Sequence, residues 1–94
     1  MEDETALRLR IHGRVQGVGY RHWFGQAAES LGVHGWVRNR SDGTVEAVIC
    51  GPVDRLNQLI ERAHNGPVAA RVRNIAQEPE YSIGHTEFIC LPTL

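Results

Sequence analysis

The chain has 94 residues, of which 41% are hydrophobic and 22% charged, so it is long enough for one compact globular domain with a single core. No apolar run approaches the roughly 20 residues that cross a bilayer, which excludes a membrane-spanning helix. The net charge of −1 combines ten cationic side chains, all arginine, with eleven acidic ones, and this balance argues against the broad basic surface that binds nucleic acid.

The first predicted element is a strand. Leu7, Leu9 and Ile11 alternate with polar residues, which is the pattern of a strand with one buried face. After a glycine-rich loop, apolar residues recur at helical spacing and predict a helix over residues 21–31, which Gly32 ends.

A hairpin is predicted next, with strands over residues 33–40 and 44–50. The two strands are joined by Ser41-Asp42-Gly43, and an Asp-Gly pair between strand patterns is typical of a hairpin turn. Pro52 then opens a second amphipathic helix, which ends at Gly66-Pro67.

Two further strand patterns close the chain, over residues 70–77 and 81–91, the second interrupted by Gly84. The order strand, helix, strand, strand, helix, strand is the split βαβ arrangement. We therefore predict an α/β (α+β) sandwich of ferredoxin-like fold, with an antiparallel sheet and two helices on one face.

The two ends of the chain and its two cysteines suggest further expectations. We expect one domain over residues 1–94, with residues 1–5 disordered because they are acidic and lack an apolar segment. The lack of a signal peptide predicts a cytoplasmic protein. Cys50 and Cys90 fall in apolar strand patterns without CxxC spacing, so we expect buried thiols, and a disulfide remains open.

The loop between the first strand and the first helix is suited to an anion. Gly17 and Gly19 allow positive φ angles, which turn successive backbone N–H groups inward as a nest for phosphate oxygens. The helix that follows adds its positive end. Arg21 at that end is unfavourable for stability unless an anion is also present, although a plain strand-to-helix turn with a solvated arginine fits the local pattern equally well.

The residues near this loop exclude several kinds of chemistry. The loop has no serine or cysteine, which argues against covalent catalysis. The five histidines have no metal-binding spacing, and paired carboxylates are missing, so we expect no metal. His22 lies beside the loop, but we expect it to face solvent rather than act as a base.

Phosphoryl transfer without a metal or nucleophile needs a positioned water and a positive cradle. Asn39 can orient the water with its amide, although an asparagine before a turn also has a purely local role. We expect its neighbours Arg38 and Arg40 to be solvated strand arginines.

Two motifs in order resemble the acylphosphatase family. The first runs from Gly13 to Arg21 and matches glycine, any residue, Val-Gln-Gly-Val, any residue, an aromatic and arginine. The second is Gly35-Trp36-Val37-Arg38-Asn39, followed by Asp42-Gly43-Thr44-Val45-Glu46. The resemblance covers residues 6–91.

The resemblance implies a monomeric, cofactor-free hydrolase with a ferredoxin-like fold. It would cleave the carboxyl-phosphate bond of an acyl phosphate to carboxylate and inorganic phosphate. Arg21 would bind phosphate and Asn39 would position the attacking water. The implied phosphate-binding residues are Val15, Gln16, Gly17, Val18, Gly19, Tyr20 and Arg21. Tyr20 stands where the family usually has phenylalanine, so its ring should pack in the core while its hydroxyl needs a partner.

Other functions remain as alternatives. One is a non-catalytic, phosphate-binding regulatory module, although such a module would not need Asn39. Another is RNA binding on the open sheet face, which the sequence disfavours because the positions expected to be exposed hold no RNP-type aromatics; these positions are Arg8, Arg10, His12, Thr44, Glu46 and Val48. A third is use of carbamoyl phosphate, as in hydrogenase-maturation proteins whose N-terminal domain resembles this family; those domains head longer chains, so we expect a free-standing enzyme.

Overall fold

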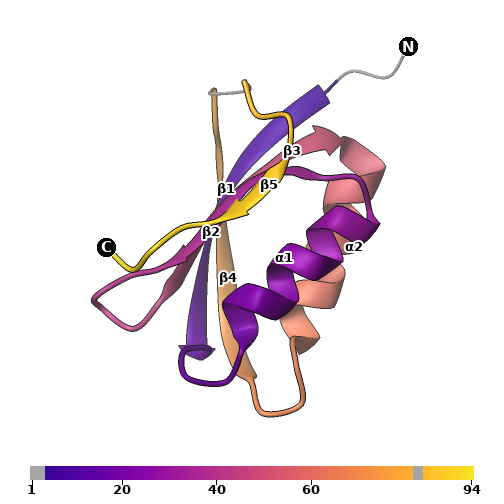
Figure 1. The fold of residues 1–94 in the computed structure, drawn as a ribbon. Helices are drawn as coiled ribbons and strands as arrows, with labels where there is room; N and C mark the ends of the chain where they lie inside the picture. The colour runs from indigo at the N-terminus through magenta and orange to yellow at the C-terminus, as the bar shows by residue number, and fades with distance from the viewer. Residues whose placement is uncertain (1–3, 82–83) are drawn as a thin grey trace.

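The computed structural model describes residues 4–81 and 84–94, which form five strands and two helices (Figure 1). In chain order these elements are β1 (Glu4–Arg14), α1 (Tyr20–Ser30), β2 (His34–Asn39), β3 (Val45–Pro52), α2 (Val53–Asn65), β4 (Arg71–Pro79) and β5 (Phe88–Cys90). Among these described residues, no helix is long and apolar enough to cross a membrane.

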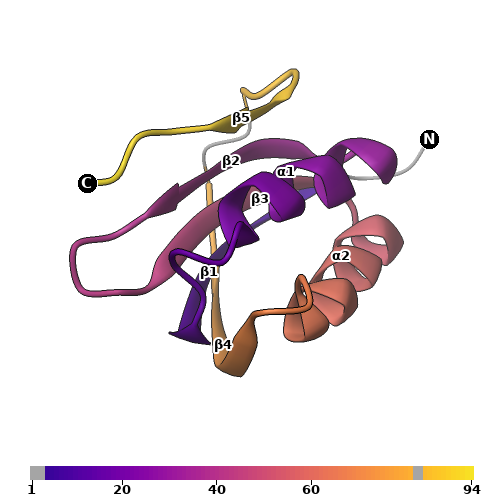
Figure 2. The same cartoon turned by 60° about the horizontal axis from the view of Figure 1, so that its bottom comes forward.

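The strands form one sheet in the order β4-β1-β3-β2-β5. The pairs β4-β1, β1-β3 and β3-β2 are antiparallel, whereas β5 runs parallel to β2. Helix α1 packs on β2 and β5, and α2 packs on β3 and β4, so both helices cover one face of the sheet (Figure 2). The predicted ferredoxin-like α+β fold is confirmed, and the parallel edge strand makes the sheet mixed.

The core lies between the helices and the sheet. Leu9 and Ile11 of β1 are fully buried, as their alternation predicted, and Phe24 of α1 is fully buried against them. The hairpin between β2 and β3 also forms as predicted. Its turn is closed by Asp42, whose Oδ1 accepts hydrogen bonds from the backbone N–H of Thr44 at 3.0 Å and from the Thr44 hydroxyl at 2.6 Å.

Two expectations about the ends of the chain need correction. Glu4 and Thr5 are not disordered: they belong to β1 and pair with Pro52 and Gly51 of β3. Residues 1–3 of the expected disordered start lie outside the described residues. The predicted strand over 81–91 is much shorter, because only Phe88–Cys90 pair with β2; residues 82–83 of that prediction also lie outside the described residues.

The open face of the sheet is less exposed than the sequence suggested. Glu46 is only 4% exposed, because arginines surround it. Its carboxylate lies 3.4 Å from Arg8, 3.6 Å from Arg10 and 3.2 Å from Arg40. Arg40 is therefore half-buried and paired rather than solvated.

Beside this ionic cluster lies a small apolar one, which corrects further expectations. Val48 is buried with Ala6 and Cys50, and Trp36 packs against them. The Arg38 guanidinium lies 5.6 Å from the centre of the Trp36 ring, so this arginine also has a partner. Thr44, expected to be exposed, is buried as well.

The two cysteines have different surroundings. Cys50 is buried, as expected, whereas Cys90 is exposed. The difference follows from position, since Cys50 lies on the central strand β3 and Cys90 on the edge strand β5.

Candidate active site

The site begins with the loop that joins β1 to α1. Gly17 and Gly19 have φ angles of 74° and 78°, in the left-handed region that glycine adopts without steric cost. The backbone N–H groups of residues 16–19 donate to no group among the residues that the structure describes. Consecutive unused N–H donors in such a loop are what an anion-binding nest requires.

Helix α1 adds to this positive character. Its N-cap is Gly19, which has no side chain to accept a hydrogen bond. The first turn, all of whose residues the structure describes, contains no acidic residue. The first N–H groups of a helix have no partner within the helix, and the helix dipole is positive at that end. An anion in the loop would satisfy these donors.

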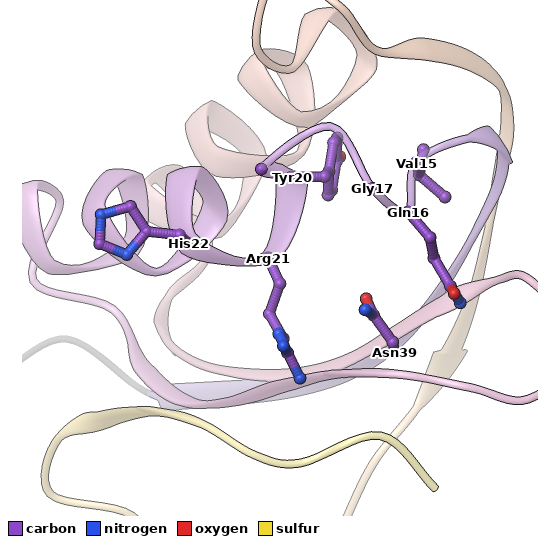
Figure 3. A pocket seen from close by; sticks show the side chains of 8 residues that line it. Val15, Gln16, Gly17, Tyr20, Arg21, His22 and Asn39 are labelled. Carbon is purple, nitrogen blue, oxygen red and sulfur yellow. The ribbon is translucent and has the colours of Figure 1, made fainter.

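A pocket of about 350 Å³ opens at this point. Loop, helix and β2 all contribute to it (Figure 3). Its lining residues are Val15, Gln16, Gly17, Gly19, Tyr20, Arg21, His22 and Asn39. The structure thus brings together every residue expected at the site except Val18, whose side chain instead packs against the core.

Arg21 extends from the first turn of α1 into the space between the helix and β2 (Figure 3). Its guanidinium Nη1 donates a hydrogen bond of 2.7 Å to the backbone carbonyl of Leu91. This contact uses one N–H group of the guanidinium. A guanidinium carries five N–H donors, so others remain for a bound anion.

Asn39 ends strand β2 on the other side of the pocket. In Figure 3 its amide points toward the space between Arg21 and the loop. The Oδ1 atom is buried and has no hydrogen-bond partner among the described residues. A buried polar atom without a partner is costly and marks a place where a bound water or substrate would complete the bonding.

Gln16 joins the loop to the hairpin. Its side-chain Nε2 donates to the backbone carbonyls of Arg40 and Thr44, each at 2.8 Å. These two carbonyls lie on either side of the turn between β2 and β3, and Arg40 directly follows Asn39. Gln16 therefore fixes the distance between the loop amides and Asn39, a role that the sequence did not reveal.

The family model and the relatives identified by sequence indicate one family. The Acylphosphatase family model matches residues 7–90. The chain belongs to the acylphosphatase family. It is 51% identical to an acylphosphatase of Azoarcus sp. over 89 residues, covering 95% of this chain and 91% of the relative. It is 57% identical to an acylphosphatase of Thermococcus kodakarensis over 75 residues, covering 77% and 82%.

A solved acylphosphatase from Coxiella burnetii has the same architecture, with a TM-score of 0.90 and 36% identity, covering 95% of this chain and 94% of that one. The resemblance inferred from the two motifs is confirmed, and so is the prediction of an enzyme that hydrolyses acyl phosphates.

Tyr20, the aromatic residue of the first motif, is almost fully buried. Its ring lies against those of Trp23 and Phe24, with centroids 5.5 and 6.2 Å away. Its hydroxyl donates a 2.7 Å hydrogen bond to the carbonyl of Ala63 in α2, the partner that the sequence required. Burial raises the pKa of this phenol well above its ordinary value of 10.0, so the hydroxyl remains a neutral hydrogen-bond donor at physiological pH.

His22 is exposed at the rim, as predicted. Its ring points to the opposite side of Arg21 from Asn39 (Figure 3). Within residues 4–81 and 84–94, no group of three or more His, Cys, Asp or Glu side chains is placed to hold a metal ion. The positive groups that the described residues bring to this acylphosphatase pocket include the Arg21 guanidinium and the N-terminus of α1.

Proposed function

We propose that this chain hydrolyses acyl phosphates by direct attack of water on phosphorus, with no metal or other cofactor. The loop amides of residues 15–20 and the Arg21 guanidinium would hold the phosphate, and Asn39 would orient the water. The observation that carries this proposal is the buried, unpartnered Oδ1 of Asn39, which faces the same pocket as Arg21 and the unused amides.

The reaction needs little covalent chemistry from the protein. A bond forms between the water oxygen and phosphorus while the bond from phosphorus to the acyl oxygen breaks, and the carboxylate leaves with the electron pair. The water proton passes to the phosphate or to the leaving carboxylate. Since carboxylate is a good leaving group, the main tasks of the protein are positioning and charge neutralisation, which Arg21 and the amide nest perform.

The proposal also includes the location, the oligomeric state and the partners of the enzyme. We propose a cytoplasmic monomer whose partners are the acyl phosphate and inorganic phosphate, without nucleic acid. The charge distribution supports the absence of nucleic acid, because three arginines on the open sheet face are balanced by three carboxylates: Arg8, Arg10 and Arg40 pair with Glu46, Glu80 and Asp42. Paired arginines leave little free positive charge for a phosphate backbone.

The test is hydrolysis of benzoyl phosphate in EDTA by the parent chain, Arg21→Ala and Asn39→Ala. Arg21→Ala should lose phosphate binding and most turnover, more than the roughly 2.7–4 kcal/mol typical of one oxyanion donor. Asn39→Ala should keep phosphate inhibition and lose kcat. Matched controls are Arg73→Ala and Asn74→Ala, exposed positions on β4, which should keep parental rates.

The possible outcomes test the roles of Arg21 and Asn39 separately, and they distinguish an enzyme from a non-catalytic phosphate-binding module. Near-normal kcat/KM in Arg21→Ala would remove its assignment. Weaker phosphate inhibition with unchanged kcat in Asn39→Ala would remove the water-positioning role. A parent chain that binds phosphate without hydrolysing either acetyl or benzoyl phosphate would favour the non-catalytic, anion-binding module.

A further inference from the structure

A second hollow adjoins the phosphate pocket at Arg21 and His22. It has a volume of about 320 Å³ and is lined by Arg21, His22, Cys90, Leu91 and Pro92. Arg21 and His22 line both hollows, whereas Asn39 and the loop glycines line only the first. Arg21 and His22 therefore form the wall that the phosphate pocket and this second hollow share.

The lining of the second hollow is mainly uncharged. Leu91 and Pro92 are apolar, and the Cys90 thiol lies 3.6 Å from the backbone carbonyl of Arg21. Although the residue is exposed as a whole, partial desolvation of the sulfur raises the pKa of this thiol, and the nearby Arg21 opposes the shift; the net direction favours the uncharged thiol. None of the five lining residues is acidic. Such a surface suits an uncharged, apolar group attached to an anion that Arg21 holds.

The position of the hollow agrees with the geometry of the reaction. In an in-line displacement the attacking and leaving oxygens lie on opposite sides of phosphorus. With water at Asn39, the leaving carboxylate points away from Asn39. Figure 3 shows His22 and Asn39 on opposite sides of Arg21. His22 lines the second hollow, whereas Asn39 does not.

We propose that the hollow between His22 and residues 90–92 receives the acyl part of the substrate and favours compact apolar acyl groups, such as benzoyl, over acetyl. This inference rests on the proposed function, because it assumes phosphate in the loop and water at Asn39. The proposal makes His22 and Pro92 specificity residues for the acyl group. The loop amides and Arg21 bind only the phosphate.

The size of the hollow sets the expected effect. A closed cavity of roughly 150 Å³ already holds benzene, so a hollow of about 320 Å³ has room for a phenyl ring. One methylene in an enclosed pocket changes specificity by roughly 10–200-fold. The exposed rims at His22 and Pro92 leave the ring partly in water, so we expect a preference of about 3–10-fold.

The experiment compares kcat/KM for benzoyl phosphate with kcat/KM for acetyl phosphate. It uses the parent chain, the double variant His22→Ala with Pro92→Ala, and a matched double variant, Gln26→Ala with Thr93→Ala. The control positions are exposed and lie on the same helix and tail without lining the hollow. Inhibition by inorganic phosphate is measured for all three, because it reports the cradle alone.

The proposal expects the benzoyl-to-acetyl ratio to fall by about 3–10-fold in the His22/Pro92 variant, with phosphate inhibition unchanged and the control equal to the parent. An unchanged ratio would overturn it, and so would an equal fall in the control. If the parent hydrolyses both substrates while the ratio stays constant, only this inference fails. If the parent hydrolyses neither, the proposed function itself fails.

Discussion

At the scale of single residues, Gln16 holds the loop that forms one side of the pocket at a fixed position relative to Asn39 on the other side. Its Nε2 bonds to the carbonyls of Arg40 and Thr44 connect the loop to the hairpin that carries Asn39. Gln16→Ala should lower stability by about 1–2 kcal/mol, since each net hydrogen bond contributes about 0.5–1.5 kcal/mol. It should also lower kcat/KM about 10–100-fold, because misplacement by about 1 Å costs up to roughly 100-fold.

Urea unfolding and benzoyl phosphate kinetics measure the two effects, with exposed Gln77→Ala as the control. A Gln16→Ala variant with kcat/KM within about twofold of the parent would show that the loop holds its place without this bond.

The same scale shows which site residues the sequence can predict. Gly17, Gly19 and Arg21 were found because glycine and arginine have distinct backbone and charge properties that only certain arrangements use. Gln16 was expected only through its backbone, since the acceptors of its side chain are carbonyls, which every residue has. The contact from Arg21 to the Leu91 carbonyl was missed for the same reason: which distant carbonyl meets a side chain depends on tertiary packing.

At the scale of elements, the segment from β5 to the end of the described chain braces β2. Past Cys90, the Leu91 N–H donates to the Val37 carbonyl at 2.8 Å and the Leu94 N–H to the Asn39 carbonyl at 3.0 Å. The Ser41 N–H donates in turn to the Leu94 carbonyl at 2.9 Å. The tail therefore holds the backbone of Asn39 from the edge of the sheet, opposite β3.

Removing residues 92–94 tests this brace. The truncated chain should lose about 1 kcal/mol of stability, a fall in Tm of roughly 4–8 °C. Its kcat should fall more than its phosphate inhibition changes, because Leu91 stays in place for Arg21 while Asn39 loses its outer support. Thermal denaturation and kinetics measure both, and Leu94→Ala, which keeps the backbone bonds, serves as the control. Parental kcat after truncation would contradict the brace.

This element also shows where prediction from sequence ends. The alternation that predicted β1 reflects one buried and one wet face, and it succeeded for Leu9 and Ile11. The last strand was predicted too long because its apolar residues are spread over a longer stretch, in which residues 88–90 alone among the described residues form a strand. The burial of Glu46 was unforeseen for a related reason: arginines from β1 and from the hairpin meet over it only in the folded sheet.

At the scale of the whole molecule, Tyr20 links the first helix to the second. Ala63, whose carbonyl accepts the Tyr20 hydroxyl, lies in the last turn of α2, where helix carbonyls lack partners within the helix. The bond thus caps the C-terminal end of α2 from the first residue of α1, and both residues are buried. Its loss would affect global unfolding rather than one loop.

Tyr20→Phe should therefore cost about 1–2 kcal/mol of stability near neutral pH, since it leaves a buried carbonyl unpartnered. The pH dependence has a definite sign. Because burial raises the folded pKa of Tyr20 above 10.0, the stability linked to its neutral form is complete below about pH 10 and is lost as pH rises toward the folded pKa. Near pH 11 the parent should have lost about 1.4 kcal/mol that the phenylalanine variant keeps.

Urea unfolding near pH 7.5 and near pH 11 should therefore show the difference in stability between parent and variant shrinking at the higher pH. Tyr81→Phe is the matched control, because Tyr81 is 88% exposed and its substitution should leave stability unchanged at both pH values. A constant difference between the parent and Tyr20→Phe would mean that the phenol ionises as easily in the folded chain as in the unfolded one, which burial between the two helices does not allow.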